Sequence, residues 1–465
     1  MRYFKAVAFA AALFFISIPK DKKVLNSTLN IALMEAMKIL NTKTADFWKQ
    51  LEVACEQAEG FAGIADAVSS VIESVRKNGD SALEEFTLKF DGAKIPAKSM
   101  RVSDAEIKEA LAKVSAKNKK MIREAVACVR EYHKHTRPKN WRAKNPHGAV
   151  IGENFYPINR VGLYIPGGHA PLVSTVVMTA TLAVLAGCPE ICVCTPPSKD
   201  GSINPHILAA LSIVGVKEIY KLGGAQAIAA MGVGTKTIKA VDKLYGPGNA
   251  FVIEAKRQLF GSTGCDLLPG PSEVLILADA SAEARYVAAD LLSQAEHGSG
   301  REKIFLVSTS KKLISDVEKL LPKMASKLSR ADALMKIINE GCVAILAPNI
   351  DVACAVAEYV SPEHMEVMVK DVSAIPAKIK TAGAILSGNF TPTVLGDFTA
   401  GPSHTLPTGR TGRFSGGLQL IDFMRRSSFV KYDKKSIKNA SSVVAAFADM
   451  EGLDAHGSSL LERLK

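Results

Sequence analysis

One stretch decides the fold class of this chain: residues 160–171, which read RVGLYIPGGHAP. The first six residues predict a buried strand, and the remainder predicts a tight turn. The apolar run at 173–186 then predicts a helix. A strand, a glycine-rich turn and a helix form the repeating unit of a parallel sheet that is covered by helices.

This unit repeats in two series along the chain. The first continues with strands at 190–194, 217–221 and 240–244 and helices at 205–214, 225–231 and 250–259. The second has strands at 273–278, 303–307, 342–346 and 383–386 and helices at 282–294, 313–321 and 350–359. Alternation of this kind implies right-handed crossovers and parallel strands. We therefore expect an α/β fold with two doubly wound, Rossmann-like parallel-sheet domains.

The rest of the chain is expected to be mainly helical. Apolar residues recur at helical spacing between 43 and 90, and Ser103-Asp104-Ala105-Glu106 has the form of a capping box that opens a long helix. After a glycine-rich loop, helices are expected at 436–450 and 453–464. We therefore expect a helical leader that packs on the core, two Rossmann-like domains and a small helical C-terminal tail that docks on a partner. The boundaries are 37–145, 146–265, 266–406 and 407–465.

Residues 1–36 allow two interpretations. A short basic start precedes an apolar run at 6–18, as in a signal peptide, but the run is short for a membrane span and no Ala-x-Ala site follows it. Alternatively, Met37 is the natural start and the extension reflects the assignment of the translation start. We favour the second interpretation, which predicts a cytoplasmic protein without a membrane segment.

The composition is that of a globular protein with a local excess of positive charge. The chain has 465 residues, 48% of them hydrophobic, and a formal net charge of +12. Residues 101–144 carry thirteen Lys or Arg against five Asp or Glu, which a solvated helix face explains as well as a nucleic-acid surface does. The sequence lacks zinc-finger spacing and basic–aromatic interleaving, so no nucleic acid is expected. The eight cysteines include no Cys-x-x-Cys pair and lie mostly in apolar runs, which indicates buried thiols.

Polar side chains gather at the end of the predicted helix 282–294. In Ser293-Gln294-Ala295-Glu296-His297-Gly298, Gln294 and His297 lie three positions apart and project from one side of a last helical turn. The pair suits a metal ion, although a capping or solvated histidine is the more common explanation.

Ser361-Pro362-Glu363-His364 supplies an adjacent carboxylate and imidazole. Because Pro362 ends any preceding helix, we expect Glu363 and His364 on a rigid, exposed turn. Two proton acceptors near neutral pH suit a reaction with two successive deprotonations. A surface Glu–His pair is an equal alternative.

Further polar groups follow toward the C-terminus. Asp397 precedes the loop 401–408, which contains His404, and Glu451 and His456 lie five apart in the terminal helices. A mixed oxygen and nitrogen ligand set that suits zinc or manganese results if the fold brings together Gln294, His297, Asp397 and His456. Their separation in the sequence does not establish this.

The glycine-rich turns raise the possibility of a dinucleotide. Turns after predicted strands place backbone N–H groups at helix N-termini, where nucleotide phosphates bind. None of them is a Gly-x-Gly-x-x-Gly fingerprint, so tight turns between strand and helix are an equal explanation.

Seven short motifs follow one another along the chain. They are YIPGG (164–168), GGAQA (223–227), YGPGN (245–249), GPSE (270–273), SQAEH (293–297), SPEH (361–364) and GPSHTLPT (401–408). In order and spacing they resemble the motifs of the histidinol dehydrogenase family, from about Met37 to the C-terminus.

The resemblance implies a zinc-dependent, NAD-linked oxidoreductase that converts L-histidinol to L-histidine through L-histidinaldehyde, the end of histidine biosynthesis. It implies that Glu363 activates water and that His364 is the general base. The implied zinc ligands are Gln294, His297, Asp397 and His456, the last of them from the partner in a homodimer. The implied substrate contacts are Ser272, Gln294, His297, His364, Asp397, His404, Glu451 and His456. The implied NAD contacts are Tyr164, Gln226 and Asn249.

Two other functions stay open at this point. A relative on the same scaffold could oxidise another small alcohol, such as a sulfonated diol, although Glu451 and His456 favour a substrate that carries an imidazole. A basic nucleic-acid or metal-binding protein without catalysis would bind DNA in a salt-sensitive way and produce no NADH.

Overall fold

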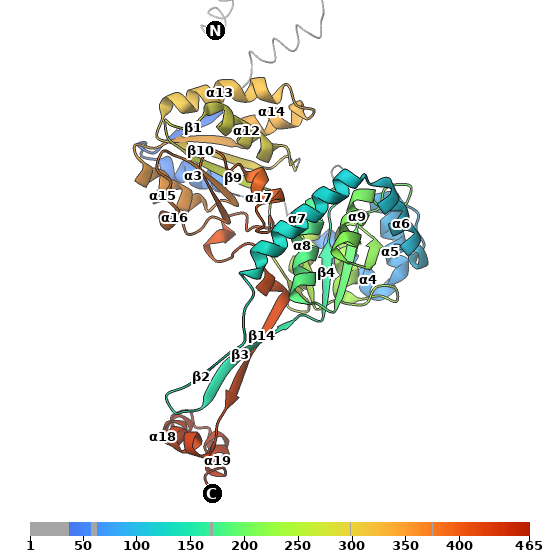
Figure 1. Ribbon diagram of the computed structural model, residues 1–465, viewed down its shortest axis with the longest axis vertical. Helices are drawn as coiled ribbons and strands as arrows, with labels where there is room; N and C mark the ends of the chain where they lie inside the picture. The colour runs from blue at the N-terminus through green and yellow to red at the C-terminus, as the bar shows by residue number, and fades with distance from the viewer. Residues whose placement is uncertain (1–36, 57–62, 168–170, 298, 374) are drawn as a thin grey trace, which may run out of the picture.

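The computed structural model describes residues 37–56, 63–167, 171–297, 299–373 and 375–465. These residues form two α/β units and a narrow arm that ends in two helices (Figure 1). Predictions for residues 1–36, for Gly168 and His169 in the first turn and for Gly298 fall outside the described residues. The two units, each with its own parallel sheet, confirm the expected fold class.

The first unit contains a five-stranded parallel sheet in the order β6-β5-β4-β7-β8. Its strands are β4 (Arg160–Tyr164), β5 (Glu190–Thr195), β6 (Glu218–Lys221), β7 (Lys243–Tyr245) and β8 (Gly264–Cys265). The connecting helices are α8 (Val173–Ala186), α9 (Pro205–Val214), α10 (Gly224–Val233) and α11 (Ala250–Leu259). Helices cover both faces of this sheet, and the central strand β4 is therefore buried along its whole length.

Most of the predicted helical leader packs on this first unit. Its helices are α4 (Ile64–Asn78), α5 (Asp80–Phe86), α6 (Asp104–Lys113) and α7 (Ala116–Lys134). The capping box at the start of α6 is confirmed, because Ser103 and Glu106 exchange both expected hydrogen bonds. The single long helix expected after it is wrong. The helix ends at Lys113, and Ser115 caps a new one by accepting a hydrogen bond from the Asn118 N–H.

The second unit contains a six-stranded parallel sheet in the order β1-β11-β10-β9-β12-β13. Its strands are β1 (Lys38–Asn41), β9 (Glu273–Ala278), β10 (Lys303–Ser308), β11 (Cys342–Leu346), β12 (His364–Met368) and β13 (Ala384–Ser387). One face packs against α12 (Ala284–Ala295), α13 (Lys311–Ala325) and α14 (Ala331–Glu340). The other packs against α3 (Phe47–Cys55), α15 (Ile350–Val360) and α16 (Ile375–Lys378). The short helix α17 (Thr393–Phe398) follows β13.

The start of the predicted leader was assigned wrongly. Residues 38–41 form β1, which pairs in parallel with β11, and α3 packs on the same sheet. A strand of four residues is too short to show a period, and its partner lies about 300 residues away in the sequence. Local pattern therefore could not identify it.

An antiparallel arm projects from the base of the first unit (Figure 1). It consists of β2 (Trp141–Lys144), β3 (Val150–Pro157) and β14 (Met424–Lys431), in the order β14-β3-β2. At its tip lie α18 (Lys434–Met450) and α19 (Asp454–Leu461), which confirm the two expected C-terminal helices. The arm itself was not predicted. Its base is fixed to the first sheet, because the ring of Phe423 stacks on Tyr245 and the Tyr245 hydroxyl donates a hydrogen bond to the Asp422 carbonyl.

All eight cysteines are free thiols, and seven of them are buried, as predicted. Among the described residues, no helix combines the length and the apolar character that a membrane crossing requires.

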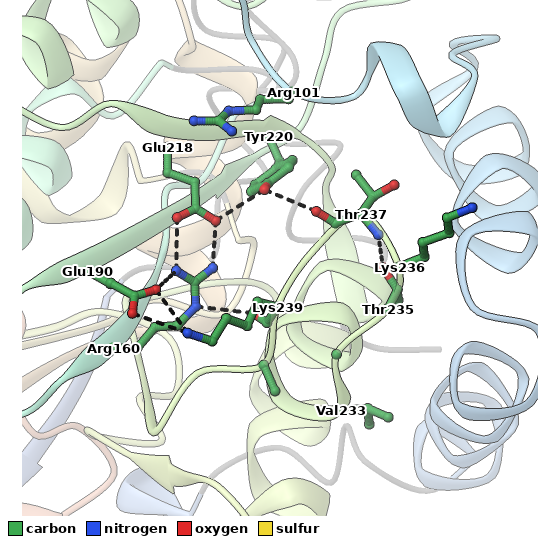
Figure 2. Close-up of a pocket in the computed structure, with 12 residues that line it drawn as sticks. Arg101, Arg160, Glu190, Glu218, Tyr220, Val233, Thr235, Lys236, Thr237 and Lys239 are labelled. Carbon is green, nitrogen blue, oxygen red and sulfur yellow. Dashed lines mark hydrogen bonds and ion pairs between the residues drawn. The ribbon is translucent and has the colours of Figure 1, made fainter.

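An ion-pair network closes the amino edge of the first sheet. A cavity of about 600 Å³ lies at this edge. Figure 2 shows the residues that line it, among them the first residues of β4, β5 and β6. The buried Arg160 guanidinium donates to the Glu190 carboxylate at 2.7 Å and to both oxygens of Glu218, at 2.5 and 2.9 Å. The Tyr220 hydroxyl in turn donates to Glu218. Because these charged groups satisfy one another's hydrogen bonds, the network is a structural feature that joins three strands and not a ligand-binding site.

We predict that Arg160→Met lowers the free energy of unfolding by about 3 kcal/mol, because it leaves the carboxylate of Glu218 without its buried partner. The matched control is Lys239→Met, which removes an exposed cation from Glu190 and should cost less than about 1 kcal/mol. Urea denaturation of both variants measures the difference. Equal losses would show that the buried arginine has no special role.

Candidate active site

The predicted site residues lie at the carboxyl edge of the first sheet and at the amino edge of the second. Tyr164 is the last residue of β4, Gln226 lies in α10 after β6, and Asn249 caps α11 after β7, so all three lie at the carboxyl edge of the first sheet. His364 begins β12, and Ser272 directly precedes β9, so these two lie at the amino edge of the second sheet. Only residues 266–272 connect β8 to β9, which keeps the two edges within a short loop of one another.

The expected exposed turn for Glu363 and His364 is wrong, because both side chains are buried, with relative exposures of 7% and 5%. His364 is the first residue of β12, which lies between β9 and β13 inside the sheet. Ser361 has a φ of 49°, in the left-handed region, and this turns the chain from α15 directly into the sheet. The proline ends the helix as expected, but the chain then enters the interior instead of following the surface.

The imidazole of His364 lies between two carboxylates. Its Nδ1 atom is 3.7 Å from Glu363 Oε2, and its Nε2 atom is 3.6 Å from Asp397 Oδ1. Burial alone would lower the pKa of His364, but the two carboxylates outweigh it and raise the pKa to about 9. The site therefore stabilises the imidazolium, the form that a base reaches after it has taken up a proton.

Glu363, one of the two carboxylates beside His364, lies next to another buried acidic residue, Glu273. Burial raises the pKa of Glu363 to about 7, and it raises the pKa of the neighbouring Glu273 to a similar value. The two groups are joined through the backbone, because the Glu273 N–H donates to Glu363 Oε2 at 2.9 Å. A carboxyl with a pKa near 7 is suited to accept a proton from water at neutral pH.

Two of the four predicted metal ligands, His297 and Asp397, lie close to His364, and a third, Gln294, lies three residues before His297 in α12. Gln294 lies in the last turn of α12 and is 2% exposed, yet neither polar atom of its side chain has a hydrogen-bond partner among the described residues. His297 follows one turn later, with Nδ1 at 3.5 Å from Ser272 Oγ. Burial raises the pKa of Asp397, but His364 and, to smaller extents, His404 and His297 lower it, so that the carboxyl has a lowered pKa and lies within electrostatic reach of His297. A buried amide without partners is costly, so the arrangement suits a bound cation that takes the amide oxygen.

His404 reaches the same region from the loop 401–408. This loop rests on α7 of the first unit so closely that a Cβ on Gly401 would lie 2.7 Å from the Cys128 carbonyl oxygen. Burial lowers the pKa of His404, which favours the neutral imidazole, and its Nε2 atom has no partner within the described part of the chain.

Glu451 and His456 are not part of this cluster. Both are exposed and lie in or beside the two helices at the tip of the arm, far from their own chain's second unit in Figure 1. One chain therefore does not bring together the four predicted ligands. Consistent with this, the described residues contain no group of three His, Cys, Asp or Glu side chains spaced for a metal ion.

A family model described as histidinol dehydrogenase matches residues 55–464. The chain belongs to the histidinol dehydrogenase family. Curated histidinol dehydrogenases of Heliobacterium mobile and Geobacillus kaustophilus are each 41% identical, over 87% and 86% of this chain and 94% and 93% of the relatives. The crystal structure of histidinol dehydrogenase from Elizabethkingia anophelis has a TM-score of 0.87 and 35% identity, and the match covers 92% of this chain and 98% of that one.

Membership in the histidinol dehydrogenase family identifies the protein as an oxidoreductase. The three predicted cofactor residues at the carboxyl edge of the first sheet have contacts that fix their positions. The Tyr164 hydroxyl accepts a hydrogen bond from the Gly224 N–H at 3.1 Å. The amide nitrogen of Gln226 donates to Asp91 at 3.4 Å, and the Asn249 side chain caps α11. These contacts hold the three predicted cofactor residues in place at one edge.

Sequence reasoning missed two acidic residues in this member of the histidinol dehydrogenase family. Asp91 comes from the helical leader, and burial raises its pKa to about 6. It is followed by a glycine, but nothing in its local pattern connects it with Gln226. Glu273 could have been predicted from the sequence, because it belongs to the GPSE motif from which only Ser272 was selected.

Proposed function

We propose that this protein oxidises L-histidinol to L-histidine in two NAD-linked steps through L-histidinaldehyde, as a zinc-dependent, cytoplasmic homodimer. The observation that carries the proposal is the buried imidazole of His364, held between Glu363 and Asp397. Gln294, three residues before His297, adds a buried amide that has no hydrogen-bond partner among the described residues. A proton acceptor, a second base and a cation site together are what two successive oxidations of an alcohol and a hydrated aldehyde require.

Gln294, His297 and Asp397 would hold the zinc ion, together with His456 of a second copy. Bound there, zinc would orient the imidazole and amine of the substrate so that its alcohol carbon faces the nicotinamide. This chain supplies an amide oxygen, an imidazole and a carboxylate, which is a suitable donor set with room for one further ligand. The amide of Gln294 is the strongest support, since it is buried and neither of its polar atoms has a hydrogen-bond partner in the described ranges.

In the first step, His364 accepts the hydroxyl proton of histidinol from its neutral form, which a pKa of about 9 makes the minority form at neutral pH, while hydride passes to NAD⁺ and the aldehyde forms. The flanking carboxylates favour this transfer because they stabilise the resulting imidazolium. In the second step, Glu363 removes a proton from water as it adds to the aldehyde. A second hydride then passes to another NAD⁺, the remaining hydroxyl proton of the hydrate is lost to solvent, and the carboxylate of histidine results.

The proposed dimer rests on apolar side chains that the single chain leaves exposed. At the tip of the arm, Phe447, Met450 and Leu461 have relative exposures of 56%, 70% and 55%. Beside the active site, Phe398 in α17 and Phe390 before it are 52% and 83% exposed. An apolar cluster at the end of a projecting arm and another beside an incomplete site would be covered if the tail of each copy docked on the other.

The proposed function predicts NADH release when the full chain is incubated with zinc, NAD⁺ and L-histidinol. About two NADH should form per histidinol consumed, because each oxidation transfers one hydride. Dialysis against a strong chelator should abolish the reaction, and added zinc should restore it. A yield of one NADH with accumulated aldehyde, or activity after complete removal of metal, would contradict the proposal.

Glu363 gives a prediction for the second step alone. Since burial raises the pKa of this carboxyl to about 7, the base form increases as the pH passes upward through about 7, and the rate of histidinaldehyde oxidation should rise with it. Glu363→Gln should lose this rise and slow aldehyde oxidation by about 10²–10⁴-fold. Stopped-flow measurement of NADH from the aldehyde tests both. An unchanged pH profile in the variant would exclude Glu363 as the base.

The shared site can be tested by complementation. His364→Asn and His456→Ala should each be inactive, because each removes one group from every site. A mixture that is dissociated and reassociated should regain about a quarter of wild-type activity, since half of the dimers are mixed and one of their two sites is intact. Activity is measured as NADH formation, with each variant alone as control. No recovery, despite exchange of subunits shown by mass spectrometry, would place all ligands in one chain.

A further inference from the structure

A buried glutamate, Glu366, lies on the same strand as His364 and further into the sheet. Glu366 is two residues further along β12, so its side chain projects from the same face, and it is completely buried. The register supports this placement. His364 and Glu366 pair with Val274 and Ile276 of β9, both of which face the layer that contains α12.

One oxygen of Glu366 holds the beginning of α17. Glu366 Oε1 accepts two hydrogen bonds from Thr393, from the backbone N–H and from the hydroxyl, each at 2.6 Å. Thr393 is the first residue of α17, and Asp397 follows one helical turn later on the same side. Because α17 is only six residues long and exposes Leu395 and Phe398, few other contacts fix its orientation.

The other side of Glu366 faces α12. Asp290 lies one turn before Gln294 on this helix and close enough to Glu366 for the two carboxyl groups to interact. Burial and the neighbouring carboxylate raise the pKa of Asp290, which favours a protonated group that can donate a hydrogen bond to Glu366. Such a donor would satisfy Glu366 Oε2, which has no other partner among the described residues.

We propose that Glu366 is a positioning residue that links α12, β12 and α17 and thereby sets the relative placement of Gln294, His364 and Asp397. This role rests on the proposed function of those three residues. A carboxylate suits it because two charge-assisted hydrogen bonds at one oxygen fix both the distance and the direction of the helix start. Partners that orient metal ligands from behind commonly change metal affinity by 10–100-fold when they are removed.

The test uses Thr393→Val in the full chain, which removes the hydroxyl that donates to Glu366 and keeps the shape of the side chain. The matched control is Thr237→Val in the first unit, where a threonine hydroxyl likewise donates to a carboxylate, that of Asp80 at 2.7 Å. Glu366→Gln serves as the conservative variant, because its amide keeps an acceptor for Thr393 and gains a donor for Asp290.

Zinc affinity is measured by competition with a chelator, and kcat and the KM for NAD⁺ are measured separately. Thr393→Val should weaken zinc binding by about 10-fold and lower kcat, with the KM for NAD⁺ unchanged, whereas Thr237→Val should leave all three near wild type. Glu366→Gln should lie closer to wild type than Thr393→Val. Equal zinc affinity and kcat in Thr393→Val and Thr237→Val would overturn the proposal.

Hydrogen exchange of the amides in 393–398 separates this inference from the proposed function. If wild-type protein binds zinc but does not oxidise histidinol, the proposed function fails, while faster exchange in Thr393→Val than in wild type still supports the role of Glu366. Exchange that is unchanged in Thr393→Val would overturn that role whatever the activity of the wild type.

Discussion

His364 is buried between the carboxylates of Glu363 and Asp397. The free-energy cost of burying these three ionisable groups limits how the surrounding residues can be arranged. Ionisable groups cannot be buried singly without a large cost, so each one here has a neighbour of opposite charge or a backbone donor. The imidazole is paired on both sides, and Glu363 accepts from the backbone of Glu273. Precise packing of the surrounding elements is what keeps these pairs at their distances.

The predicted site residues lie at unlike edges of the two sheets. Parallel sheets of this type usually bind ligands at their carboxyl ends, a rule that agrees with the position of the predicted cofactor contacts Tyr164, Gln226 and Asn249 in the first unit. The second unit departs from it, because Ser272 and His364 lie where its strands begin. The short connection of residues 266–272 thus links the carboxyl edge of the first sheet to the amino edge of the second.

Local sequence predicted much of this fold, because each strand–turn–helix unit spans only a few tens of residues. The strands at 273–278 and 342–346 were predicted to the residue. What failed depends on partners far away in the chain: β1 pairs with β11, and β3 pairs with β14 across more than 250 residues. The burial of His364 failed for the same reason, since only the neighbouring strands β9 and β13 enclose it. The motifs gave candidate site residues, but the contacts of Gln226 with Asp91 and of Thr393 with Glu366 join segments that no motif connects.

The arm has a consequence for the order in which the molecule is made. Its middle strand, β3, lies near the first third of the chain, whereas β14 lies close to the end. During synthesis β3 therefore waits with one edge unpaired until nearly all of both α/β units has left the ribosome, and unpaired edges promote aggregation. Loss of the last residues through premature termination would leave that edge permanently open, even where both units had already folded.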